Sequence, residues 1–170
     1  MSKYQVTLKD IKSYYPSKSS WKKLLKSQNK KRADNELFDI ADILESNGVN
    51  DFVSFLPALD EKHNNDVRLL LCDIAERALR FVPKNETRPA EAIRVARLYV
   101  QGKVNTDELR AASEAARNVA TNAAWAAAWA ASDAVTHAAW GVINDAAWAA
   151  DSEALERDVQ KQIIKTWLKS

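Results

Sequence analysis

The sequence contains few residues that interrupt helices or form disulfides. Its 170 residues include three glycines, four prolines and one cysteine. A single cysteine excludes an intrachain disulfide, so the chain fits a reducing compartment. Alternating β-branched runs are almost absent, whereas apolar residues recur at the 3.6-residue period of a helix along nearly the whole chain. These features predict an all-helical fold.

Long apolar runs and a strong net charge are also missing. No stretch approaches the roughly eighteen apolar residues of a membrane span, and the N-terminal sequence MSKYQVTLKD lacks the apolar core of a signal peptide. We therefore expect a cytoplasmic protein that does not contact membranes. The formal net charge of +2 is too small to indicate, by itself, a nucleic-acid or acidic partner.

The length and the 46% hydrophobic content fit one globular domain with a real core. We predict an all-α fold, a single compact multi-helix domain over residues 1–170. Its parts are a basic N-terminal helical segment (1–33), a helical core (34–104) and Ala/Trp-rich helices (105–170).

Capping residues and hydrophobic spacing place the first helices. Thr7 and Ser20 are expected N-caps of two short helices, and NELFDIADILESNG is expected to be a helix that stops at Gly48. The stretch VRLLLCDIAERALRFV is apolar on most sides, so we predict that it is the most buried helix. RPAEAIRVARLYVQG has proline in its first turn and glycine just past its end, which is typical of a helix.

The segment NAAWAAAWAASDAVTHAAW repeats tryptophan within a run of alanine. At about 100° per residue, Trp129 and Trp140 lie within roughly 60° of Trp125 on a helix. The same arc carries polar residues, among them Asn122 and Asp133, while the opposite face holds small residues that let another helix approach closely. The tryptophans either pack over neighbouring helices or form a protein-binding strip, because tryptophan is enriched in interface hot spots.

The Ala/Trp-rich part is expected to contain one long helix, opened by a capping box between Asn105 and Glu108. If this helix ran on unbroken, Asp145 would fall on its small-residue face. We therefore expect a bend or break around Gly141 to Asp145, followed by a last helix through ALERDVQKQIIKTWLK.

Basic residues are concentrated near the N-terminus. Eight of them and no acid lie between Ile11 and Ala33, at Lys12, Lys18, Lys22, Lys23, Lys26, Lys30, Lys31 and Arg32. From Asp34 onward, 15 basic residues stand against 22 acidic ones. We interpret the basic segment as a solvated face that complements the acidic remainder. Contact with nucleic-acid phosphates is the less favoured alternative, because no recognised motif accompanies the charge.

An acidic face is expected on the helix that ends at Gly48. Glu36, Asp39, Asp42 and Glu45 fall on the side away from its apolar residues. Such a face is usually only solvated. Its functional interpretation is a surface complementary to a basic partner, where charge speeds encounter and fixes register.

Residues that could carry chemistry are scattered. The two histidines stand alone, and neither a glycine-rich phosphate loop nor an H-E-x-x-H motif occurs. Cys72 has apolar neighbours on its helix and is expected to be an inert core thiol. Asp73 and Glu76 form a carboxylate pair that Arg77 and Arg80 are in place to neutralise. We therefore expect no enzyme, no cofactor and no metal site.

The order of the motifs resembles that of a known family. A W-x-x-L-L helix is followed by LFDIADILESNGVNDFVSFLP, RLLLCDIAERALRFVP and RPAEAIRVARLYVQGKVNTDELRAASEAARNVA, which runs into the Ala/Trp repeat. Over residues 21–150 this pattern resembles the Imm-five-like group of immunity proteins from bacterial polymorphic-toxin systems, a group also found in phages. The resemblance implies an all-helical inhibitor that binds a cognate toxin domain.

We accordingly expect a non-enzymatic protein that occludes the active site of a cognate toxin or effector. It would bind through the acidic residues around Asp39 and through a tryptophan face made of Asn122, Trp125, Trp129, Asp133 and Trp140. The alternatives are a phage or mobile-element protein that inhibits a host defence enzyme, and a helical protein that self-associates into a homo-oligomer.

Overall fold

The computed structural model describes residues 3–119, 121–132, 135–150 and 153–170, with the backbone alone over 135–140. The described helices are α1 (Leu8–Ser13), α2 (Lys18–Ser27), α3 (Ala41–Asn47), α4 (Val49–Ser54), α5 (Asn64–Ala78), α6 (Arg88–Val100), α7 (Thr106–Arg117), α8 (Asn122–Ala130), α9 (Val135–Ala149) and α10 (Glu153–Trp167). Short 3-10 turns span Leu56–Ala58, Glu61–His63 and Leu79–Phe81. The predicted all-α class is confirmed.

A small antiparallel sheet joins the N-terminus to the segment before α3. Strand β1 (Gln5–Thr7) pairs with β2 (Leu37–Asp39). The prediction of a helix over NELFDIADILESNG was wrong for its first half, because residues 37–39 pair with β1 and α3 begins only at Ala41. Pairing with a distant segment thus overrides the local helical spacing. We call residues 3–47, which hold β1, α1, α2, β2 and α3, the N-terminal lobe.

The caps of the N-terminal helices agree in part with the sequence. Thr7 forms the predicted cap, as a capping box with Asp10. Ser20 was the wrong cap for α2, because the Ser17 hydroxyl accepts the hydrogen bond of the Ser20 N–H at 3.1 Å and the helix starts one residue after Ser17. Gly48 ends α3 as predicted, with φ of 92°, where a side chain would be strained.

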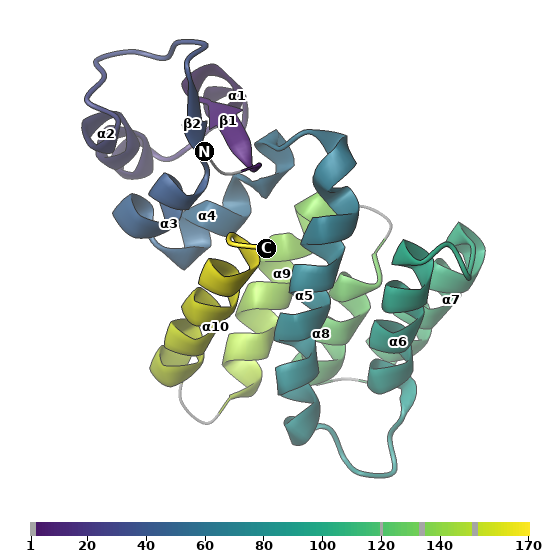
Figure 1. Ribbon diagram of the computed structural model, residues 1–170. Helices are drawn as coiled ribbons and strands as arrows, with labels where there is room; N and C mark the ends of the chain where they lie inside the picture. Colours follow the sequence, from purple (N-terminus) through teal and green to yellow (C-terminus); the bar gives the residue numbers. More distant parts are fainter. Residues whose placement is uncertain (1–2, 120, 133–134, 151–152) are drawn as a thin grey trace.

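We call α5 to α10 the helical layer. Helix α5 packs against α6, α8, α9 and α10 and lies at the centre of this layer (Figure 1). As predicted, it is apolar on most sides, and eight of its residues are buried. One of them is Arg68, only 3% exposed, which donates hydrogen bonds to the carbonyls of Ala130 (3.2 Å) and Ser132 (2.6 Å). A buried cation at the C-terminal end of α8 satisfies carbonyls that the helix leaves open and offsets its dipole.

The Ala/Trp-rich part divides into α7, α8 and α9, so the prediction of one long helix was wrong. The capping box of Asn105 and Glu108 does open α7. That helix ends at Arg117, and Thr121 then caps α8 by accepting the Ala124 N–H at 3.2 Å. Of the bend or break predicted around Gly141 to Asp145, the break is absent, since α9 runs through both residues.

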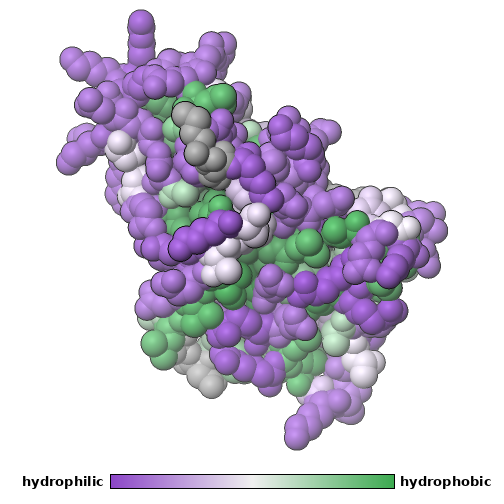
Figure 2. Space-filling model, viewed as in Figure 1, coloured by the Kyte–Doolittle hydropathy of each residue, from purple (hydrophilic) through white to green (hydrophobic). Residues whose placement is uncertain are grey.

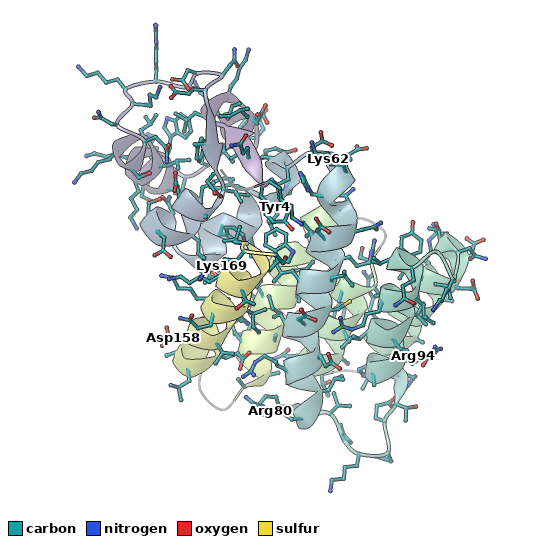
Figure 3. The ribbon with its side chains drawn as sticks, in the orientation of Figure 1. Tyr4, Lys62, Arg80, Arg94, Asp158 and Lys169 are labelled. Atoms are coloured by element: carbon teal, nitrogen blue, oxygen red, sulfur yellow. The ribbon has the colours of Figure 1, made fainter. Side chains whose placement is uncertain are left out.

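The C-terminal helix α10 is tied to the start of the chain and to α5. The Trp167 ring stacks on Tyr4 at 4.0 Å between centroids, and its indole N–H donates to the Asp66 carbonyl at 3.1 Å. Figure 3 shows Tyr4 at this junction beside the end of α10. At the other end of α10, Glu156 is 4% exposed and accepts two hydrogen bonds from Arg77, at 3.0 and 3.1 Å.

The pairing of Arg77 with Glu156 generates a stability prediction. Arg77→Ala leaves the buried carboxylate with the longer contact to Arg80 (3.5 Å) alone, so the free energy of unfolding should fall by about 2 kcal/mol. Arg94→Ala is the matched control, because Arg94 pairs with the exposed Glu91 and should change stability by less than about 0.5 kcal/mol. Urea unfolding followed by circular dichroism measures both, and equal losses in the two variants would contradict the assignment.

Candidate functional site

Helix α8 is buried on nearly every side. Its alanines at 123, 124, 126, 127, 128 and 130 are each at most 1% exposed, because α5, α6, α7 and α9 all pack against this short helix. Its remaining residues are Asn122 and Trp125, which are exposed, and Trp129, which is partly buried. The predicted arc of Asn122, Trp125 and Trp129 therefore exists. Small residues cover all of the remaining helix surface, and not only the face opposite this arc.

The Trp129 side chain of α8 packs between α7 and α9. A Cβ placed on Gly141 of α9 would lie 2.6 Å from the Trp129 indole, so the ring occupies the space that a side chain at 141 would need. Its N–H donates to the Asp145 carboxylate at 3.1 Å. The Arg117 guanidinium of α7 lies 4.6 Å from the ring centroid, within range of a cation–π interaction.

The contact with Trp129 also explains why α9 continues where a break was expected. Burial raises the pKa of the Asp145 carboxyl, and the hydrogen bond from the Trp129 indole opposes that rise. The carboxylate is thus tolerated in a partly buried position because a donor from the next helix meets it.

Two exposed tryptophans lie near the contact of Trp129 with α9. Trp125 is 37% exposed and its ring lies 6.3 Å from that of Trp129. On α9, Trp148 is 51% exposed and stands three residues after Asp145, on the helical face that meets Trp129. Asn122, Trp125, Trp129 and Trp148 form what we call the tryptophan strip. Trp148 was missed in the sequence, although its i, i+4, i+7 spacing from Gly141 and Asp145 could have found it.

The four acidic residues expected on one helix face lie in different settings. Glu36 precedes β2 and forms an ion pair with Lys30, and the Asp39 carboxylate accepts the Ala41 N–H at 2.9 Å. Asp42 accepts a hydrogen bond from Gln28 at 3.0 Å. Glu45 pairs with Lys165 (2.8 Å) of α10, which lowers the pKa of its carboxyl. Asp39 and Glu45 line one pocket together with Lys165, whereas Glu36 and Asp42 do not line it.

Two of the expected site residues cannot be placed. Asp133 lies outside the described residues, and so does the side chain of Trp140. The other members of the tryptophan face, Asn122, Trp125 and Trp129, are brought together on α8. They lie on a different part of the molecule from the acidic residues, which belong to the N-terminal lobe (Figure 1).

The groups that could carry chemistry have structural partners. Cys72 is fully buried, as predicted, and burial raises the pKa of its thiol to about 12. The prediction that Arg77 and Arg80 neutralise Asp73 and Glu76 was wrong, because Arg97 of the next helix bonds both carboxylates at 2.8 Å. His63 is buried edge-on against Tyr4. Over the described residues, no group of three or more His, Cys, Asp or Glu side chains is arranged to hold a metal ion.

The basic segment is exposed at seven of its eight basic residues. Of its eight basic residues, Lys30 alone forms an ion pair with a described residue, and that pair is local, with Asp34 (2.8 Å) and Glu36. The predicted solvated face is confirmed, whereas its charge complementarity to the acidic remainder stays a prediction. In addition, none of the helices in the described part of the chain is long and apolar enough to cross a membrane.

A family model described as "Imm-5 like putative immunity protein" matches residues 57–152, more than half of the chain. The chain belongs to this family. The match is shorter than the resemblance expected over residues 21–150, and it leaves the whole N-terminal lobe outside. Searches of curated proteins and of solved structures gave no match. The matched range holds α5 to α9, and with them the whole tryptophan strip.

The contact between Trp129 and Gly141 predicts an unusual sign for a helix substitution. Gly→Ala inside a helix normally stabilises by up to about 1 kcal/mol. Gly141→Ala should instead lower the free energy of unfolding by about 1–3 kcal/mol, because the new methyl group overlaps the indole. In a Trp129→Ala background the same change should become stabilising. Urea unfolding of the four proteins tests this, and a stabilised Gly141→Ala single variant would contradict the packing.

The raised pKa of Asp145 predicts a pH-dependent difference. Since the native carboxyl holds its proton more tightly than the unfolded chain, its contribution to stability is lost as pH rises above 3.8. Asp145→Asn keeps an oxygen that accepts the Trp129 N–H and removes the charge. The variant should therefore gain stability relative to the wild type as pH rises from 3.8 toward 7. Asp158→Asn, on the exposed side of α10, controls for the loss of one negative charge. If the stability advantage of Asp145→Asn over the wild type instead shrinks with rising pH, the assignment is refuted.

Proposed function

We propose that this chain is a non-enzymatic immunity protein that binds a cognate bacterial toxin domain stoichiometrically and occludes its active site. Membership of the Imm-5 like family is the observation that carries the proposal. The family description names immunity but no partner, so the toxin's chemistry has to come from experiment. An inhibitor of this kind needs a rigid surface with a few strongly binding side chains rather than a catalytic group.

The tryptophan strip supports the proposal as the main contact surface. Trp125 and Trp148 expose large apolar rings within the matched range, and exposed tryptophan is characteristic of interface hot spots. The partly buried Trp129 links α8, which carries Trp125, to α9, which carries Trp148. Because α8 is buried on its other sides, the exposed Trp125 ring stands on a fixed backbone, and little conformational entropy is lost when a partner binds.

The acidic residues have a separate role in this proposal. Glu36, Asp39, Asp42 and Glu45 lie outside the matched range and already have partners within the chain. We assign to them a long-range electrostatic role that speeds encounter with a basic toxin domain. Asp133 and Trp140 remain proposed members of the tryptophan face from their sequence positions alone.

The first test of the proposal is recovery of the partner. The tagged chain is used for a pull-down from its native host, the bound protein is identified by mass spectrometry, and its toxicity is measured with and without co-expression of the chain. Recovery of one toxin domain at equal stoichiometry, with rescue of growth, is expected. Recovery of the chain alone as a homo-oligomer, or of a host defence enzyme, would overturn the proposal.

Substitution at the exposed tryptophans tests the surface. Trp125→Ala with Trp148→Ala should weaken toxin binding by about 10-fold or more, because the two rings supply most of the apolar contact area. Leu37→Ala is the matched control, since Leu37 is 57% exposed on the N-terminal lobe. Binding is measured by calorimetry on variants whose unfolding is unchanged. Equal affinity for the double variant and the control would remove the strip from the interface.

A further inference from the structure

The N-terminal lobe carries exposed basic side chains that form no ion pairs with described residues. Lys12, Lys18, Lys22, Lys23, Lys26, Lys31 and Arg32 are all exposed, and none forms an ion pair with a described residue. Figure 2 shows this end of the molecule covered by hydrophilic side chains, many of which project into solvent. We call these seven residues the basic face. It lies outside the range that the immunity-protein family model matches.

The structure of α2 arranges part of this charge in a row. Leu24 is fully buried, and Trp21 and Leu25 pack against the core, so the apolar side of α2 is occupied by the protein itself. Lys18, Lys22 and Lys26 follow one another at four-residue spacing on the exposed side. At 1.5 Å per residue, this gives one positive charge about every 6 Å along the helix.

A tyrosine projects from the turn beside this row. Tyr14 is anchored, because its hydroxyl donates to the Pro57 carbonyl at 2.7 Å. The next residue, Tyr15, is 92% exposed and has φ of 52°, a left-handed conformation that is unfavourable for a side chain with a Cβ. Thus a strained residue presents a nearly bare aromatic ring between Lys12 and Lys18.

We propose that the basic face binds single-stranded nucleic acid, with the lysines on the phosphates and the Tyr15 ring stacked on an unpaired base. Lysine-rich charge without acidic partners suits a polyphosphate backbone, and an exposed aromatic beside it is the usual platform for bases. A membrane surface fits less well, since the apolar side of α2 is buried in the core. An acidic protein surface fits less well because it would leave the projecting Tyr15 without a function.

The activity is separate from toxin binding. The basic face belongs to α1, α2 and the loop after α2, whereas the tryptophan strip belongs to α8 and α9 in the helical layer (Figure 1). A variant at one surface should therefore leave the other unaffected. The two proposals can fail independently, because one is tested with an oligonucleotide and the other with a toxin domain.

The experiment measures fluorescence anisotropy of a labelled single-stranded oligonucleotide titrated with the full chain over a range of salt concentrations. Lys22→Gln, Lys23→Gln and Lys26→Gln together should weaken binding at low salt and reduce the slope of log K against log salt by about 2, since each phosphate contact on a single strand contributes about 0.7. Lys84→Gln, Lys103→Gln and Lys169→Gln, exposed lysines outside the basic face, form the matched control and should change neither quantity.

Tyr15 has its own pair of variants. Tyr15→Asn tolerates the left-handed backbone and should keep the fold while weakening binding on the order of 10-fold, because one stacked base is lost. Tyr15→Phe keeps the ring and should bind like the wild type. No binding at low salt, equal loss in the two lysine triples, or equal binding of polyglutamate would overturn the proposal. Equal affinity for duplex DNA with no effect of Tyr15→Asn would overturn the single-strand assignment.

Discussion

The close approach of α8 to its neighbours is the constraint on which the helical layer depends. Helix α8 offers alanine on almost every side, so the backbones of four other helices can pack around it. Alanine buries little apolar area for each residue, and cohesion therefore has to come from close packing and from a few large side chains. Trp129 is one of these, because it spans the space between α7 and α9 above a glycine.

This packing also determines which aromatic rings remain available. The Trp129 indole is held by Asp145 and Arg117, so its role in the fold is satisfied within the chain. Trp125 of α8 and Trp148 of α9 are exposed to solvent on helices that pack against each other. A face of this kind binds with little rearrangement. The protein therefore combines a structural tryptophan with two that suit recognition, and all three lie in the range shared with the immunity-protein family.

The helix ends show what the sequence could and could not predict. Capping at Thr7 and Asn105 and termination at Gly48 are local effects, and the structure has all three. Residues 37–39 pair with β1, about thirty residues away in the chain, and no local pattern records that partner. The predicted break in α9 failed for the same reason, since the donor that meets Asp145 comes from another helix.

The candidate site was predictable only in part. Helical angles grouped Asn122, Trp125 and Trp129 correctly because those three residues share one short helix. Angles counted from Trp125 could not bring Trp148 to the strip, because α8 and α9 are separate helices, whereas spacing counted from Asp145 within α9 could have done so. The expected acidic face failed once part of its helix became a strand. The ion pair of Glu45 depends on Lys165, which is adjacent only in the folded chain.

The most direct test of the central claim is hydroxyl-radical footprinting of the chain alone and in complex with the toxin domain recovered from its host. If the tryptophan strip is the interface, oxidation of Trp125 and Trp148 should fall sharply in the complex, while that of the exposed Tyr15 on the N-terminal lobe should stay constant. Unchanged oxidation of both tryptophans, with protection elsewhere, would show that the toxin binds a different surface.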